Sequence, residues 1–245
     1  MISENSHAKD RRRVAAIGIA LISGFLVTLL AVSGCQQTAS SVVVDFPDPE
    51  LEAAIRNAIG IQTRDIHNTD LDELTDVYVD PGRISNLEGI QHCTNLTSLE
   101  LGHNQIRDIS PLSGLTNLTF LNLSDNQIRD ISPLSGLTNL AHTLYLSNNQ
   151  IHDISPLSKL IHLTGLNLAH NQIRDISPLS GLTNLTGLEL RDNLIDDIQG
   201  LVDNPGLAGG YVGLRDNDLD LMAGSQDMRG IRLLLDRGVY VEYGP

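Results

Sequence analysis

Apolar residues recur at fixed intervals through the middle of the chain. In one such stretch, Leu118, Leu121 and Leu123 form an LxxLxL pattern, and the positions after Leu118 alternate between polar and apolar residues. This alternation predicts a short β-strand whose inward side chains are Leu121 and Leu123, while Phe120 and Asn122 point outward. Stacking similar strands side by side would bury the inward leucines.

The residues after this strand predict a bend and a return to the core. Asn126 stands where the chain must turn, and its amide group can both donate and accept hydrogen bonds. A column of such residues would satisfy the backbone groups that the bends of stacked turns expose. Ile128 and Ile131 then predict a return to the core. The Ser-Pro-Leu triplet at 132–134 predicts a short helical turn, for which a 3-10 segment fits better than a full α-helix.

This unit is repeated along the chain. The string NQIRDISPLSGLTNL occurs three times unchanged, beginning at Asn104, Asn126 and Asn171, and an altered copy begins at Asn149. The leading asparagine recurs with a period of 22 residues that is broken once by 23. Self-similarity at a fixed period predicts a solenoid, in which each turn buries its apolar row against the next.

The longer repeat contains one inserted residue. Leu144 and Leu146 keep the offsets from Asn149 that the leucines of the other repeats have from their own asparagines. We therefore expect a bulge at residues 141–142 and an unchanged strand register, which keeps Tyr145 on the outward face.

The LxxLxL stretches and the repeated asparagine resemble leucine-rich repeats, specifically the 22-residue repeats of the bacterial internalins. The resemblance covers residues 74–221. It implies an α/β solenoid: a leucine-rich repeat horseshoe with a parallel concave sheet, a convex side of 3-10 or irregular segments, a helical N-terminal cap and a helix-strand C-terminal cap.

The flanking segments predict the two caps that an exposed leucine core needs. In the N-terminal cap, residues 45–73, Asp48 and Pro49 predict a helix start and Gly60 its end. In the C-terminal cap, residues 222–245, we expect a helix from Ser225 to Gly238 and then a strand at 239–243. The buried faces expected of these helices comprise Leu51, Ala54, Ile55, Ala58 and Ile59 in the first and Met228, Ile231, Leu234 and Leu235 in the second.

Residues 1–34 have the pattern of a targeting segment rather than of a fold. Four basic residues at 9–13 precede an uncharged, apolar run at 14–32, which ends in Val32-Ser33-Gly34-Cys35. This resembles the bacterial lipoprotein signal, which implies cleavage after Gly34, lipidation of Cys35 and a tether at 35–44. The protein would then lie in the cell envelope, anchored to the outer leaflet of the cell membrane or to the outer membrane and facing outside the cytoplasm. The alternative is an uncleaved transmembrane helix, because 19 such residues can just span a bilayer.

Charge and composition exclude several classes of function. The chain carries 30 acidic and 16 basic residues, and the balance argues against nucleic acid as the main partner because neutralising phosphates needs a basic patch. The sequence contains no GxSxG, HExxH or P-loop motif and no cysteine pair at metal spacing. We therefore expect no enzyme, no cofactor and no metal site, and we expect a monomer. Cys93 replaces a core leucine of the repeat.

A column of aspartates follows the isoleucines of successive repeats. A calcium ladder is the functional interpretation, but calcium needs six to eight oxygen ligands and most of these aspartates follow a basic residue. We instead expect their carboxylates to accept backbone or serine hydrogen bonds, with the basic column at 107, 129, 152 and 174 offsetting their repulsion. The column consists of Asp108, Asp130, Asp153, Asp175 and Asp197.

The strongest indication of function is a contrast within the repeats. Three copies are identical, whereas the outward strand positions between them vary, which indicates a preserved scaffold with one diversified face. That face also includes Ser124, Ser147 and Ala169, and the small residues Gly165 and Gly187 predict a shallow depression beside Tyr145. The candidate partner-binding residues are Tyr78, Glu100, Phe120, Asn122, Tyr145, Asn167, Glu189, Arg191 and Tyr211.

Exposed aromatic side chains are frequent interface anchors, so we expect the concave face to bind an unidentified protein. Random drift of exposed positions after duplication would also produce the variation. Two other functions stay open: a structural spacer of the cell envelope, and a glycan-binding surface on which Tyr78, Asn122, Tyr145 and Asn167 contact sugars.

Overall fold

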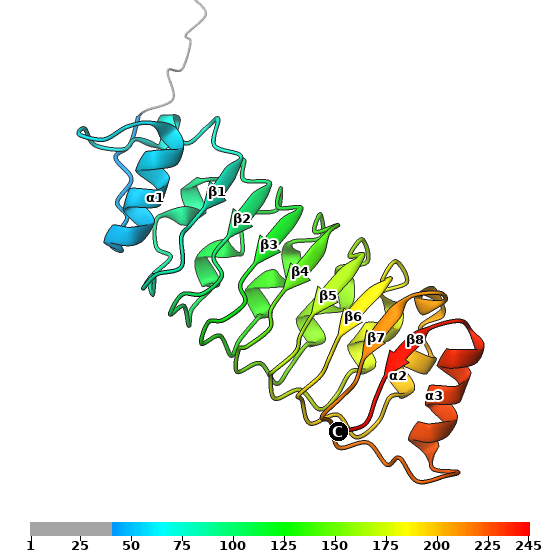
Figure 1. Cartoon of the computed structure of the whole chain (residues 1–245). Helices are drawn as coiled ribbons and strands as arrows, with labels where there is room; N and C mark the ends of the chain where they lie inside the picture. The colour runs from blue at the N-terminus through cyan, green and yellow to red at the C-terminus, as the bar shows by residue number, and fades with distance from the viewer. Residues whose placement is uncertain (1–40) are drawn as a thin grey trace, which may run out of the picture. The chain divides into compact units, whose positions relative to one another are not determined.

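The computed structural model describes residues 41–245. The expected signal segment 1–34, the lipidation site Cys35 and most of the tether lie outside the described residues. The described residues form one compact unit, in which successive turns of chain stack between a helix at each end (Figure 1).

Residues 41–245 form an eight-stranded, fully parallel sheet whose strands follow one another in chain order. Each strand is three residues long, and its central residue is buried while the flanking residues point outward. The alternation expected from the sequence is therefore confirmed, and stacking covers the apolar row of each strand. The strands are β1 (Asp76–Tyr78), β2 (Ser98–Glu100), β3 (Phe120–Asn122), β4 (Thr143–Tyr145), β5 (Gly165–Asn167), β6 (Gly187–Glu189), β7 (Tyr211–Gly213) and β8 (Tyr240–Glu242).

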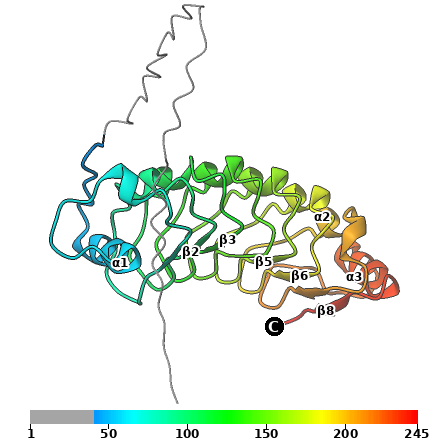
Figure 2. The same ribbon diagram turned by 90° about the horizontal axis from the view of Figure 1, so that it is seen from above.

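Short helical segments form the opposite side of the stack (Figure 2). Those of the regular repeats are 3-10 helices, as expected: η2 (Ile90–His92), η3 (Ser110–Leu112), η4 (Ser132–Gly136), η5 (Ser155–Lys159) and η6 (Ser177–Gly181). The last repeat differs, because it has a short α-helix, α2 (Gln199–Val202), before η7 (Pro205–Leu207). Gly200 opens the space for α2, since a Cβ there would lie 2.4 Å from the carbonyl oxygen of Ile176. A further 3-10 turn, η1 (Asn68–Asp70), lies in the N-terminal region.

The repeated asparagines form the expected ladder of hydrogen bonds. The Asn126 side chain is nearly buried, and its Oδ1 accepts from the Ile106 amide at 2.9 Å. Its Nδ2 donates to the carbonyl oxygens of Leu101, Leu123 and Ser124 at 3.0–3.1 Å. Because Leu101 and Ile106 belong to the previous turn, each asparagine joins two turns. Equivalent bonds are made by Asn104, Asn149, Asn171, Asn193 and Asn217.

The aspartate column has the structural role expected of it. Oδ1 of Asp130 accepts from the Ser132 amide at 2.8 Å, and Oδ2 accepts from the Ser132 hydroxyl at 3.0 Å. Backbone bonds of the same kind are made by Asp108, Asp153, Asp175 and Asp197. Within residues 41–245 these aspartates form no ion pair with the basic residues before them. Each arginine of that basic column reaches instead across to the next turn, where Arg107 and Arg129 donate to glutamines and Arg174 pairs with an aspartate.

The N-terminal helix α1 (Pro49–Ile59) begins and ends as expected. Asp48 caps it, and its Oδ1 accepts from the Glu50 and Leu51 amides. Its Oδ2 accepts from the amides of Ser85 and Asn86 at 2.9 and 3.2 Å, so one carboxylate fastens the cap to the first turn of the repeats. Ala58 is exposed, so its expected place on the buried face is wrong, whereas Leu51 and Ile55 are buried and Ile59 packs against the core.

The C-terminal helix α3 (Gln226–Asp236) follows Ser225, whose hydroxyl accepts from the Met228 amide. Ile231 and Leu234 are fully buried, whereas Leu235 is 44% exposed, so its expected place on the buried face is wrong. Strand β8 then joins the main sheet next to β7, with Val241 paired to Val212. The C-terminal segment therefore covers the end of the stack and adds one strand to the repeat sheet.

The inserted residue is absorbed ahead of β4. The amides of Ala141 and His142 both donate to the carbonyl oxygen of Thr119, and pairing of β4 with β3 then begins at Leu144, opposite Leu121. The expected bulge and unchanged register are confirmed.

Candidate interaction face

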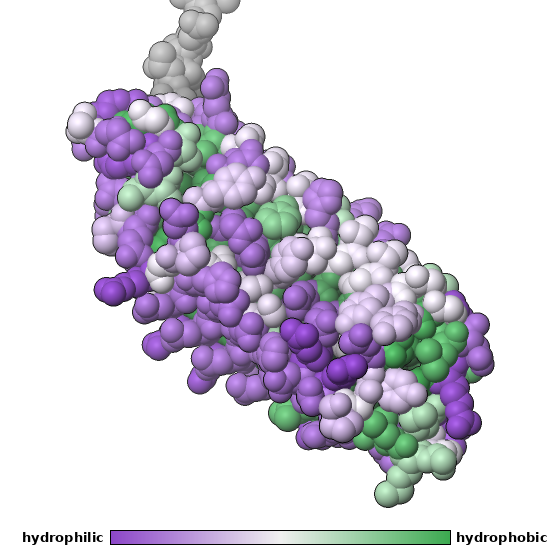
Figure 3. Space-filling model, in the orientation of Figure 1, coloured by the Kyte–Doolittle hydropathy of each residue, from purple (hydrophilic) through white to green (hydrophobic). Residues whose placement is uncertain are grey.

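The outward side chains of β1–β8 form one continuous surface, called here the sheet face, which Figure 3 shows in the orientation of Figure 1. The strand residues among the sequence candidates all lie on it, because parallel pairing places equivalent positions of successive turns side by side. Arg191 follows β6 and is exposed at the rim.

Phe120 and Tyr145 form an aromatic pair in the middle of the sheet face. Their ring centroids are 6.0 Å apart with planes tilted by 59°. Both side chains are half-buried. Such a tilted pair contributes about 0.5–1.5 kcal/mol beyond its buried area. The two rings therefore stabilise each other while presenting apolar surface to solvent.

Glu100 and Asn122 are tied to each other rather than free. Asn122 Nδ2 donates to Glu100 Oε1, and Asn122 Oδ1 accepts from the Ser124 amide at 2.9 Å. Gly102 makes this arrangement possible, since a Cβ there would lie 3.1 Å from Asn122 Nδ2. The pair forms a fixed polar surface beside the aromatic pair.

The expected depression is smaller than predicted. The Thr143 side chain covers Gly165, and a Cβ on Gly165 would lie 2.3 Å from Thr143 Oγ1. Gly187 has open space above it, because no atom lies within 4 Å of where its Cβ would be. The open space is therefore above Gly187, on the strand that pairs with the strand of Tyr211.

Ser124, Ser147 and Ala169 do not belong to the sheet face as expected. Ser124 and Ser147 are 8% and 9% exposed and their hydroxyls lie 3.1 Å apart, while Ala169 is 1% exposed. The chain has already begun its bend at these positions, which turns their side chains toward the neighbouring turn. The exposed surface is therefore narrower in these three turns, whereas Arg191 at the equivalent position after β6 is exposed.

An aromatic residue that the sequence analysis missed completes the C-terminal end of the sheet face. Tyr240 of β8 is 61% exposed and stacks on Tyr211, with ring centroids 6.0 Å apart and planes inclined by 21°. The alternation of Val239 and Val241 with Tyr240 was visible in the sequence. What the sequence did not indicate is that this segment pairs with β7 in register.

Tyr211 is the titratable group of this face with a marked shift. Its hydroxyl donates to Glu189 Oε2 at 3.0 Å. Desolvation, together with this hydrogen bond and the negative charges of Glu189 and Glu242, raises the pKa of Tyr211 to about 12. The hydroxyl is therefore a hydrogen-bond donor held in place by Glu189.

Tyr78 stands apart at the N-terminal end of the sheet face. It is 68% exposed and borders a hollow of about 300 Å³ between β1 and α1, which Glu50 and Asp80 also line. Three aromatic groups are thus spaced along the sheet face: Tyr78, the Phe120–Tyr145 pair and the Tyr211–Tyr240 pair.

Three further features of the described residues concern metal ligands, membrane spans and the free thiol. Among residues 41–245 there is no group of three or more His, Cys, Asp and Glu side chains suited to a metal ion. Within the same residues no helix has the length and apolar character needed to cross a bilayer. Cys93 is fully buried, and burial raises the pKa of its thiol to about 12, which suits its expected place in the core.

Family models of leucine-rich repeats match the chain at residues 72–128 and, in overlapping two-repeat units, at 116–159, 142–180 and 161–203. Internalin H of Listeria monocytogenes is 39% identical over 82 residues, which are 33% of this chain and 15% of that protein. The match thus spans a small part of that relative.

Solved structures extend the comparison over most of the chain. An internalin (inlF) of Listeria monocytogenes is 33% identical with a TM-score of 0.71, and the match covers 81% of this chain and 56% of that one. Internalin C2 of the same species is 34% identical with a TM-score of 0.61, over 81% of this chain and 94% of that one. A leucine-rich repeat protein of Leptospira interrogans, 20% identical over 71% of this chain and 50% of that one, shares the fold with a TM-score of 0.57. The chain belongs to the internalin-like leucine-rich repeat proteins.

Proposed function

We propose that this protein is anchored outside the cytoplasm through Cys35 and binds another protein through its sheet face. Internalin-like leucine-rich repeat proteins generally mediate protein–protein interaction. The observation that carries the proposal is the contrast between identical repeats and a varied outward surface with exposed aromatic groups. Aromatic side chains on a rigid sheet suit binding because little conformational entropy is lost when they are covered.

The anchor is proposed from the Val32-Ser33-Gly34-Cys35 sequence, which resembles a lipoprotein signal. Two or three acyl chains, at about 0.8 kcal/mol per buried CH₂, would hold the protein stably at a membrane. Replacing Cys35→Ser should abolish labelling with a fatty-acid analogue and block cleavage after Gly34. Normal labelling and processing of this variant would contradict the proposal.

The binding proposal is tested by affinity capture from envelope extract with fragment 36–245. Capture of one protein with saturable affinity is expected. A saturable glycan would instead favour the sugar-binding alternative, for which the stacked Tyr211–Tyr240 pair is the best platform. The absence of saturable binding would favour a structural spacer.

The aromatic pair provides the first variant. Phe120→Ala with Tyr145→Ala should remove most of the affinity for the captured protein. Because the rings contact each other and are half-buried, we expect to lose about 1 kcal/mol from the ring contact in addition to the cost of the lost apolar burial, which lowers the unfolding midpoint by several degrees. Unchanged binding with a much lower midpoint would place the rings in the core and the functional surface elsewhere.

Gly187 provides a variant that adds atoms without removing contacts. Gly187→Leu should occupy the open space above Gly187 and block a partner, and the added Cβ should meet no atom of the fold because that space is open. Gly114→Leu is the matched control, since Gly114 also has open space but follows η3 on the opposite side of the stack. Equal binding by both variants would exclude the surface around Gly187 from the interface.

A further inference from the structure

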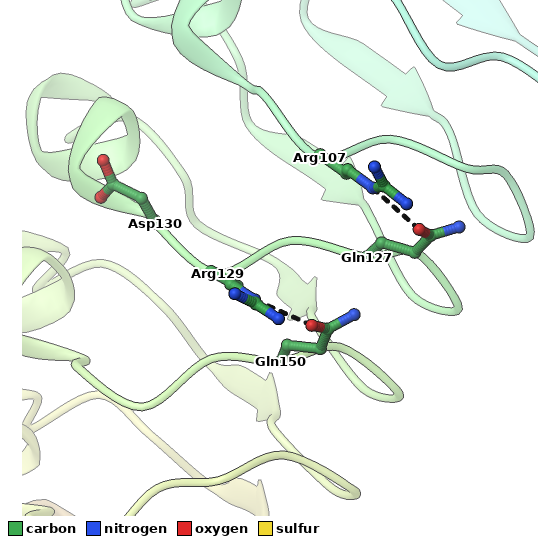
Figure 4. Close-up of a pocket in the computed structure, with 5 residues that line it drawn as sticks. All are labelled: Arg107, Gln127, Arg129, Asp130 and Gln150. Atoms are coloured by element: carbon green, nitrogen blue, oxygen red, sulfur yellow. Dashed lines mark hydrogen bonds between the residues drawn. The ribbon is translucent and has the colours of Figure 1, made fainter.

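A second hollow lies away from the sheet face, where the chain runs from the asparagine bend toward the 3-10 segments. Its volume is about 470 Å³, and Figure 4 shows the residues that line it: Arg107, Gln127, Arg129, Asp130 and Gln150. They come from three successive turns of the repeat.

Each arginine is held in place by a glutamine of the next turn. Arg107 Nε donates to Gln127 Oε1 at 2.9 Å, and Arg129 Nε donates to Gln150 Oε1 at 2.8 Å. The terminal guanidinium nitrogens of both arginines find no hydrogen-bond acceptor within residues 41–245, and the same is true of Nε2 of both glutamines. The hollow is therefore lined by N–H groups that are held in place and that have no acceptor among the described residues, so they can donate to a ligand.

A later turn of the same chain shows which group satisfies such an arginine. Arg174 occupies the equivalent position, but the next turn has Leu194 where the others have glutamine. There the guanidinium pairs with the carboxylate of Asp196 and lies 3.8 Å from that of Asp218. The chain thus supplies carboxylates to Arg174 and none to Arg107 or Arg129.

The negative charge in the lining does not neutralise the two arginines. Asp130 forms no ion pair with either one, and both of its oxygens accept hydrogen bonds from Ser132. Figure 4 shows its carboxylate turned away from the guanidinium groups. Two guanidinium groups on adjacent turns repel each other, and an anion between them would relieve that repulsion.

We propose that this hollow binds carboxylates of an acidic peptide segment, such as neighbouring glutamate side chains of a partner protein. The planar guanidinium group matches a carboxylate with two parallel hydrogen bonds, and the Arg174–Asp196 pair is the same chemistry made within the chain. Parallel strands place the two arginines on turns about 4.8 Å apart, close enough for one acidic segment to contact both. The site does not depend on any ligand of the sheet face.

The test uses the full chain in detergent micelles and a fluorescently labelled tetraglutamate peptide, with fluorescence polarisation as the readout at low salt. Saturable binding is expected, and it should weaken as salt is added. The double variant Arg107→Gln with Arg129→Gln should lose about tenfold in affinity. Arg174→Gln is the matched control and should bind as the unchanged protein does.

Three results would overturn the proposal. One is the absence of saturable binding of tetraglutamate, and another is equal affinity of the double variant while its unfolding midpoint is unchanged. The third is that inorganic phosphate or dextran sulfate displaces the peptide at a lower concentration than unlabelled tetraglutamate does, which would assign the hollow to a phosphate or a sulfated polysaccharide.

Discussion

Asn126 illustrates how a single side chain connects the turns. Its amide group makes four hydrogen bonds with backbone groups, two of them to the previous turn. Because the side chain is only 7% exposed, water cannot replace these partners. We expect Asn126→Ala to lower the free energy of unfolding by about 2 kcal/mol or more, as measured by urea denaturation.

Asn139 is the control for this prediction. Its Nδ2 donates to the carbonyl oxygen of Thr116 at 2.8 Å, also across to the previous turn, but the bond is exposed. Asn139→Ala should therefore change the free energy of unfolding by less than about 1 kcal/mol. Equal effects of the two substitutions would mean that burial does not determine the contribution of the ladder.

Tyr211 provides a prediction for high pH. Its folded-state pKa of about 12 lies above the ordinary tyrosine value of 10.0, so its contribution to stability is present below pH 10 and is lost as the pH rises toward 12. The phenolate absorbance that Tyr211→Phe removes should titrate near pH 12. Glu189→Gln should lower that midpoint, because it removes the negative charge beside the hydroxyl. A midpoint unaffected by Glu189→Gln would assign the shift to desolvation alone.

At the scale of elements, the repeat made most of the fold predictable. Strands, bends and 3-10 segments follow from a pattern that occurs several times, so each copy supports the others. The sequence was less informative where the pattern ends. α2 differs from the 3-10 segments because Gly200 permits close approach to η6. Tyr240 was missed because its strand pairs with β7 across an intervening helix.

The hydrogen-bond partners of side chains on neighbouring turns could not be predicted from the sequence either. Each arginine of the basic column directly precedes an aspartate in the sequence, but adjacent residues of an extended segment point to opposite sides. Arg129 therefore meets Gln150 of the next turn and not Asp130. The small size of the depression has a similar cause, since the rotation of Thr143 over Gly165 depends on side-chain packing.

The insertion before β4 yields a prediction at this scale. Deleting His142 restores the regular spacing, and since pairing is intact from Leu144 onward, the fold should tolerate the deletion with an unchanged or higher unfolding midpoint. Deleting Thr119 removes the equivalent residue from a regular turn, which pulls Leu121 out of register. We expect that variant to lose several degrees in midpoint or to fail to fold. Similar midpoints would show that the strands tolerate slippage.

For the whole molecule, contacts between neighbouring turns determine how stability is distributed. Each turn rests only on the turns beside it, so a solenoid gains stability approximately as a sum of such interfaces. Each cap contacts the stack on one side only: α1 contacts β1 at the N-terminal end, and at the C-terminal end α3 contacts α2 while β8 pairs with β7. A destabilising substitution near one end should therefore unfold that end locally, whereas one in the middle should break the contact between the two halves of the stack.

Two leucine substitutions test this distribution. Leu234 of α3 and Leu144 of β4 are both fully buried, so truncation to alanine should cost about 2–5 kcal/mol at either site. In Leu234→Ala we expect amide hydrogen exchange to accelerate in α3 and β8 while the amides of β2–β5 keep their protection. In Leu144→Ala the loss interrupts the stack between its two halves, so protection should fall along the repeats and the unfolding midpoint should drop. Uniform loss of protection in both variants would mean that the solenoid unfolds as one indivisible unit, and that its caps have no separate stability.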